Sequence, residues 1–133
     1  MFDFKKMFLL TSLKRREYLQ NKEEARKLVH QKIEYFNSFY GYEFNRISIK
    51  NQKTRWGSCS SKRNLNFNYR ILFLPEELCD YVIVHELCHL KELNHSSNFW
   101  KLVSVTITNH KEKRKKLNNT KLKEYKTIFE KKI

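Results

Sequence analysis

Between about Ser12 and Tyr40, apolar side chains recur at steps of three and four residues, which predicts a long helix with one apolar stripe. Gly41 follows directly, and glycine readily adopts the left-handed conformation that ends many helices. The helix is therefore expected to end at Tyr40. Its apolar stripe comprises Ala25, Leu28, Val29, Ile33, Phe36 and Phe39.

Two later segments, Arg46–Lys50 and Leu65–Phe73, alternate apolar and polar residues, and this period of two predicts half-buried strands. The polar connection between them contains Gly57. We expect it to be irregular apart from a short strand at about Thr54–Ser58. In the second long strand, one face would carry Leu65, Phe67, Tyr69 and Ile71, and the other Asn66, Asn68 and Arg70.

Pro75 predicts the start of a second helix, because proline is tolerated at the first helical position and two glutamates follow it. This helix is expected to run to about Leu93, with Asn94 as a left-handed cap. A third helix should begin near Ser96, with serine as its N-cap, and pass through Val103. The remaining sequence is basic and is expected to be helical in part.

The helix after Pro75 contains the sequence HELCH, in which His85 and His89 are four residues apart. Residues at this spacing share one face of a helix, so both imidazoles can bind one Zn²⁺. Glu86 lies on a neighbouring flank, where it can act as a general base on a zinc-bound water. The alternative is a buried helix whose histidines are merely hydrogen-bonded.

A catalytic zinc usually has three protein ligands and one open position. His95, just beyond the expected helix end, is the favoured third ligand, because the chain can turn back and present it. Glu92 is the alternative, since it lies seven residues after His85 and almost on the same face. Three successive turns of a straight helix reach one ion only with strain. The prediction is therefore one Zn²⁺ per chain, bound by three histidines.

Composition restricts the class of protein. The 133 residues suffice for a single domain, assigned to residues 1–133 with its core at about 24–117 and a basic C-terminal tail. The net charge of +14 favours polyanions as partners, although a solvated lysine-rich surface explains it equally well. Three cysteines without a CxxC pair favour reduced thiols and a cytoplasmic protein. No apolar stretch approaches the length of a membrane span.

Four blocks, "RWGSCS", "LNFNYR", "DYVIVHELCHL" and "NHSSNFW", resemble in order and spacing the YgjP-like metal-dependent hydrolases, a group with zincin-type metallopeptidase domains. The resemblance extends over roughly residues 24–117. It implies His85, His89 and His95 as metal ligands and Glu86 as the base. It also implies an α+β fold of minimal zincin type, with an N-terminal helix, a small mixed sheet, the HExxH helix and C-terminal helices. The group also looks related to the SprT-like proteases that cut proteins crosslinked to DNA.

Arg55 and Trp56, in the "RWGSCS" block, have two interpretations. In zincins, a sheet edge near the active-site helix binds extended peptide by strand addition, and this block could form or flank that edge. Arg55 would then contact a carboxylate or phosphate of the substrate. Alternatively, Trp56 fills the core and Arg55 is an ordinary surface residue.

Three functions compete on this sequence. The first is a zinc-dependent peptidase acting on extended polypeptide. The second is a zinc-dependent hydrolase of a nucleotide phosphoanhydride or other small anionic substrate, attracted by the positive charge. The third is a basic module with structural zinc that binds nucleic acid non-specifically. Glu86 argues against structural zinc, because closed structural sites need no base. Between the first and third lies a protease recruited to DNA by its basic surface.

Overall fold

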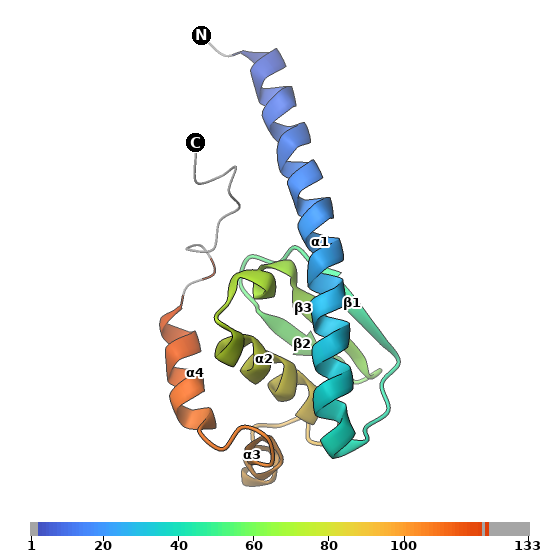
Figure 1. Cartoon of the computed structure of the whole chain (residues 1–133), viewed down its shortest axis with the longest axis vertical. Coiled ribbons are helices and arrows are strands. Elements are labelled where there is room, and N and C mark those ends of the chain that lie inside the picture. Colours follow the sequence, from blue (N-terminus) through green and yellow to red (C-terminus); the bar gives the residue numbers. More distant parts are fainter. Residues whose placement is uncertain (1–2, 121, 123–133) are drawn as a thin grey trace.

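The computed structural model describes residues 3–120 and 122, and its first element is the long helix α1, Phe4–Tyr40. This helix begins earlier than predicted, because the Asp3 carboxylate accepts a hydrogen bond from the Lys6 backbone N–H at 3.1 Å and caps its first turn. It ends as predicted, with Gly41 in the left-handed conformation at φ 70°. The first turns of α1 project beyond the sheet (Figure 1).

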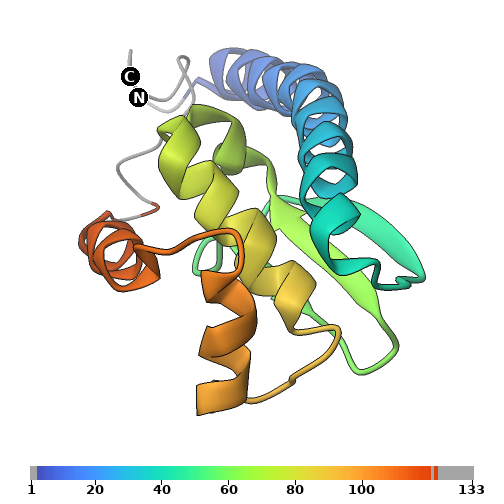
Figure 2. The same cartoon turned by 60° about the horizontal axis from the view of Figure 1, so that its bottom comes forward.

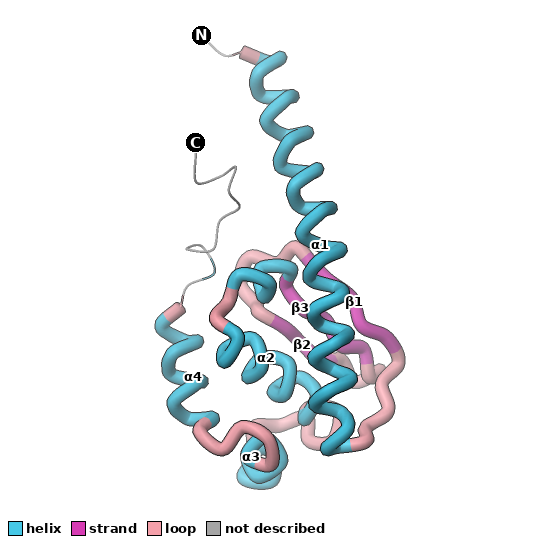
Figure 3. The backbone as a smooth tube through the Cα atoms, viewed as in Figure 1, coloured by secondary structure: helices cyan, strands magenta, loops and turns pink. Residues whose placement is uncertain are grey.

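Three strands form one mixed sheet in the order β1-β3-β2 (Figure 3). Strand β1, Arg46–Lys50, pairs in parallel with β3, Asn64–Asn68. Strand β2, Gly57–Cys59, pairs antiparallel with β3 and forms an edge of the sheet. The short strand expected at about Thr54–Ser58 is therefore present, but it begins at Gly57.

The second long strand is shorter than predicted. The chain leaves β3 at Asn68 and forms a 3-10 helix, η1, over Tyr69–Phe73. The Asn68 side chain is fully buried, and its amide donates hydrogen bonds to the backbone carbonyls of Gln52 and Arg55. The Asn68 side-chain oxygen accepts from the Arg70 backbone N–H at 3.0 Å, which caps η1 and ends the strand.

Three shorter helices follow: α2, Glu76–Cys88; α3, Ser97–Ser104; and α4, His110–Asn119. The predicted continuation of α2 to Leu93 was wrong, because the chain tightens after Cys88 into turns with bonds of the three-residue type. Asn94 does not adopt the left-handed cap, since Arg63 is the one non-glycine residue with positive φ among those described. Ser96 does cap α3, as predicted.

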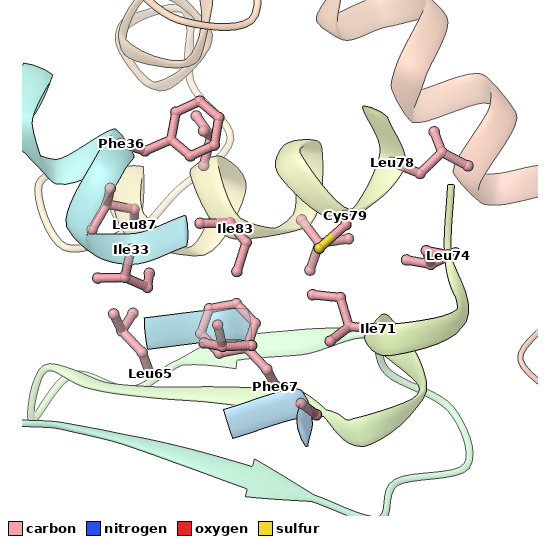
Figure 4. Packing of buried hydrophobic residues seen from close by; sticks show 14 of the residues in the cluster. Ile33, Phe36, Leu65, Phe67, Ile71, Leu74, Leu78, Cys79, Ile83 and Leu87 are labelled. Carbon is pink, nitrogen blue, oxygen red and sulfur yellow. The ribbon is translucent and has the colours of Figure 1, made fainter. Parts of the chain in front are cut away.

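Helices α1 and α2 cover one face of the sheet, and the core lies between these layers (Figures 1 and 4). The core includes Ile33 and Phe36 of α1, Ile83 and Leu87 of α2, and Leu65 and Phe67 of β3. On the other side of α2 from α1 lie α3 and α4 (Figure 2). The predicted α+β class is confirmed. None of the described helices combines the length and apolar character needed to cross a membrane.

Candidate metal centre

Three histidine side chains converge at the end of α2. His85 lies in its last turn, His89 directly follows it, and His95 comes from the connection to α3. Their Nε2 atoms are 3.1, 3.2 and 3.1 Å apart in the three pairs. The early end of α2 permits this arrangement, because the turn after Cys88 brings the chain back over the helix terminus.

The donor set fits a divalent metal ion. Nitrogen ligands about 2.0–2.1 Å from a tetrahedral Zn²⁺ are about 3.3–3.4 Å from one another, close to the spacing of the three Nε2 atoms. The tautomer also fits at His89: its Nδ1 lies 2.9 Å from the Glu92 carbonyl oxygen, which can only accept, so Nδ1 carries the proton. The Nε2 lone pair of His89 is thereby directed at the other two rings.

Burial favours the neutral form of two of these imidazoles, His85 and His89, and the neutral form is the one that binds metal. Burial lowers the pKa of His85 to about 3, and the neighbouring His89, His95 and Arg114 act in the same direction. Burial also lowers the pKa of His89, against the opposing effect of its bond to Glu92. His85 is therefore neutral well below neutral pH, and burial favours the neutral form of His89 as well.

Two aromatic rings of α3 fix the orientation of these imidazoles. Phe99, fully buried, stacks on His89 with ring centroids 4.4 Å apart and an interplanar angle of 17°. Trp100 stacks on His95 at 5.8 Å and 22°. Both rings lie in the predicted third helix, but no part in the site was predicted for them. Their position four and five residues after His95 is the signal that could have found them.

Glu86 lies beside the three histidines, in a pocket of about 280 Å³ that His85 and His95 also line. It is buried, at 7% exposure, and no described residue donates a hydrogen bond to its carboxylate. Burial raises the pKa of Glu86 to about 8, while the charge of Arg55 acts in the opposite direction. A divalent cation at the imidazoles would also lower this pKa, because positive charge favours the carboxylate.

Gly57, the first residue of β2, provides the space that Glu86 occupies. A Cβ atom at position 57 would lie 3.0 Å from the Glu86 Cγ, 3.3 Å from its Oε2, and 3.1 Å from the Asn66 carbonyl oxygen. Only a residue without a side chain lets strand and carboxylate approach this closely. The sequence analysis interpreted Gly57 as a turn signal and missed this contact.

The predicted substrate residues Arg55 and Trp56 line the same pocket as Glu86. Trp56 is half-buried and also packs against the core, so the two interpretations of this residue are compatible. Arg55 is exposed. The alternative ligand Glu92 contributes its backbone carbonyl to His89, and its side chain lies outside the cluster of ligand atoms.

Asn68 holds the loop that carries Arg55 and Trp56. Its side-chain amide donates to the Arg55 carbonyl at 2.9 Å, and its backbone N–H donates to the Trp56 carbonyl at 2.9 Å. Two further residues that the sequence analysis did not single out line the pocket, Tyr81 of α2 and Arg114 of α4. Burial raises the pKa of Tyr81 to about 12, so its phenol remains a hydrogen-bond donor.

Comparison with known proteins agrees with this geometry. The model of the YgjP-like metallopeptidase domain family matches residues 11–120. Among solved structures, the crystal structure of the metallopeptidase zymogen of Pyrococcus abyssi, abylysin, is similar with a TM-score of 0.60 and 27% identity. The similarity covers 67% of this chain and 90% of that one. No protein of curated function matches the sequence.

Proposed function

The chain belongs to the YgjP-like metallopeptidase domain family, and from this premise we propose that it is a zinc-dependent peptidase that cleaves extended polypeptide with Glu86 as general base. The observation that carries the proposal is the convergence of three imidazole nitrogens beside a buried carboxylate in one pocket. Structural zinc does not need such a carboxylate.

Three residues would hold the ion: His85, His89 and His95, each through Nε2. When bound with an open position, such an ion supplies activation of water and polarisation of the scissile carbonyl. The chain's own contribution is to orient the His89 ring, through the carbonyl of Glu92 and the stacking of Phe99, while burial favours its neutral form.

Glu86 would accept a proton from the attacking water and pass it to the amine that leaves. Its burial makes the carboxylate a stronger base than an exposed glutamate, because low polarity favours the neutral form. Gly57 leaves the space that the Glu86 side chain occupies, because a Cβ atom at that position would collide with it.

Strand β2 offers an edge for substrate. The Trp56 carbonyl accepts from Asn68 and the Ser60 N–H donates to Asn64, so residues 56, 58 and 60 direct their backbone groups toward β3. By the alternation of antiparallel strands, Gly57 and Cys59 direct theirs to the open side. An extended peptide pairing there would pass the pocket, because Gly57 lines it.

Two substitutions test this function. Glu86→Gln should retain about one zinc per chain and lose peptide cleavage by about 10²–10⁴-fold, the range for general bases. His95→Ala should lose most of the metal. The measurements are elemental analysis of untagged protein and the initial rate on an unstructured polypeptide.

Glu92→Gln is the matched control, because it makes the same change in a side chain outside the ligand cluster. It should retain both metal and activity. Full metal content in His95→Ala, or unchanged cleavage in Glu86→Gln, would contradict the proposal. Zinc-dependent turnover of nucleoside triphosphates without peptide cleavage would favour the phosphoanhydride alternative.

Recruitment to nucleic acid remains a separate proposal, supported by the net charge of +14. Phosphate contacts by lysine and arginine release counterions, so binding should weaken steeply as salt rises. Titration of labelled duplex DNA at two salt concentrations tests this mode. Affinity independent of salt would contradict it.

A further inference from the structure

Two guanidinium groups reach the metal pocket from different elements. Arg55 precedes β2 and Arg114 belongs to α4, and these elements pack beside α2, which carries the histidines. Both arginines are exposed, and both line the pocket with Glu86. Peptide entering this pocket would therefore meet positive charge from the sheet side and from the α4 side.

Among the described residues, neither arginine has a carboxylate partner. Within residues 3–120 and 122, no carboxylate forms an ion pair with Arg55 or Arg114. The adjacent basic residues of α4 differ, because Lys113 and Lys116 both pair with Glu77. The pocket contains a single carboxylate, Glu86, and this group is needed for chemistry.

Arg114 is also held in place by its neighbours. Its guanidinium lies 5.1 Å from the centre of the Trp100 ring, a cation–π contact. Trp100 in turn stacks on the ligand His95 and, at 5.0 Å and 16°, on His110. A cation–π contact does not use the N–H groups of the guanidinium as hydrogen-bond donors to an acceptor oxygen, so they can still pair with a planar anion.

A second pocket, of about 440 Å³, lies between α3 and α4. Arg114 lines both pockets, and Trp100 lines the second. Lys101 and Lys111 also line it, and none of its described lining residues is acidic. Positive charge thus continues beyond the metal pocket along the α4 side.

We propose that Arg114 and Arg55 form a clamp for a substrate carboxylate, which makes the site selective for peptide bonds close to an acidic side chain or to a free C-terminus. The inference rests on the proposed peptidase function and deepens it. Arginine matches a carboxylate through two parallel N–H donors, which a neutral side chain cannot use in the same way.

Three otherwise identical quenched fluorescent peptides test the clamp. One carries Glu beside the scissile bond with an amidated C-terminus, the second carries Gln with the same amide, and the third carries Gln with a free carboxylate. The wild type should cleave at least one acidic peptide about tenfold better in kcat/KM than the neutral one, as expected for a charge-assisted hydrogen bond. The two acidic peptides distinguish side chain from terminus.

Arg114→Met should bring this ratio close to one, and Arg55→Met should reduce it. Lys115→Met is the matched control, because this substitution removes the same charge from α4 at a residue that lines neither pocket. It should retain the preference. A wild-type ratio near one, or a preference that survives Arg114→Met, would overturn the clamp.

A binding measurement separates failure of the clamp from failure of the peptidase function. Fluorescence anisotropy of labelled Glu and Gln peptides with zinc-loaded Glu86→Gln needs no turnover. Tighter binding of the Glu peptide that is lost in Glu86→Gln with Arg114→Met supports the clamp even if no peptide is cleaved. Equal binding of both peptides overturns it.

Discussion

The two sides of the metal pocket are built differently. On the side of α2 and β2, the contacts are buried and close: Val84 and Leu87 are fully buried, and Gly57 packs directly against Glu86. On the α4 side the contacts are mixed: Leu117 packs against the core, His110 stacks on Trp100, and Lys113, the one buried residue of α4, forms an ion pair with Glu77. The proposed catalytic groups thus lie on the packed core, while the helix proposed to select substrate is attached partly by ion pairs.

The largest effect is expected from Phe99→Ala, which removes a buried aromatic ring. Removing a fully buried phenylalanine costs about 3–5 kcal/mol of folding free energy. It also removes the ring stacked on His89, so zinc affinity should fall together with stability. Chemical denaturation and a zinc titration with a competing chelator measure the two effects.

Phe99→Leu is the matched control, because it retains most of the apolar volume without the aromatic face. It should recover much of the stability. Zinc affinity that falls equally in both variants, or in neither, would show that stacking on His89 is not what orients the ligand.

A smaller effect is expected from Gly57→Ala. The added methyl group would displace the Glu86 side chain, and a misplaced catalytic group costs about 10²-fold in rate. Zinc content should stay at the wild-type level, since the atoms nearest to the added methyl group belong to Glu86 and Asn66 and not to a histidine. The rate of peptide cleavage and the metal content are the measurements.

Gly41→Ala serves as the control for this prediction. Its left-handed backbone makes the substitution destabilising, but no atom lies within 4 Å of the added carbon. It should lower stability while kcat/KM remains unchanged. Equal loss of activity in the two variants would assign the Gly57 effect to folding rather than to Glu86.

The smallest effect is expected on the α4 side, from Glu77→Gln. Hydrogen bonds from Lys113 and then Lys116 hold the pKa of Glu77 below its ordinary value. A depressed pKa means that the stabilisation is present above pH 4.5 and is lost as pH falls through the lower pKa of the folded state. The difference in Tm between wild type and variant should therefore be small at pH 7 and vanish in acid.

High salt should also reduce this difference in Tm, because Glu77 and its partner Lys116 are exposed. Glu112→Gln is the comparison, since Glu112 pairs only with Lys116 on α4 itself. It should alter Tm less than Glu77→Gln does. A difference that persists at pH 3 or in high salt would contradict an electrostatic attachment of α4.

Periodicity predicted the helices better than their ends. The stripe through Ala25, Val29 and Ile33 is buried as expected, and Gly41 ends α1. The alternation in the second strand did not reveal that Asn68 is buried, because its side chain bonds to the backbone of a loop that is distant in sequence. Likewise, the helical pattern after Cys88 did not reveal that the chain leaves α2 there to place His95 beside the other histidines.

The spacing of His85, Glu86 and His89 by itself determined which residue types share one region of a helix, because helical geometry is local. Only the tertiary structure decided the rest. Gly57 and Arg114 reach the pocket from β2 and α4, and Trp100 of α3 stacks on His95; their sequence separation from Glu86 carries no sign of this proximity. Packing of these elements against α2 places the three histidines beside a pocket with a buried carboxylate and two arginines.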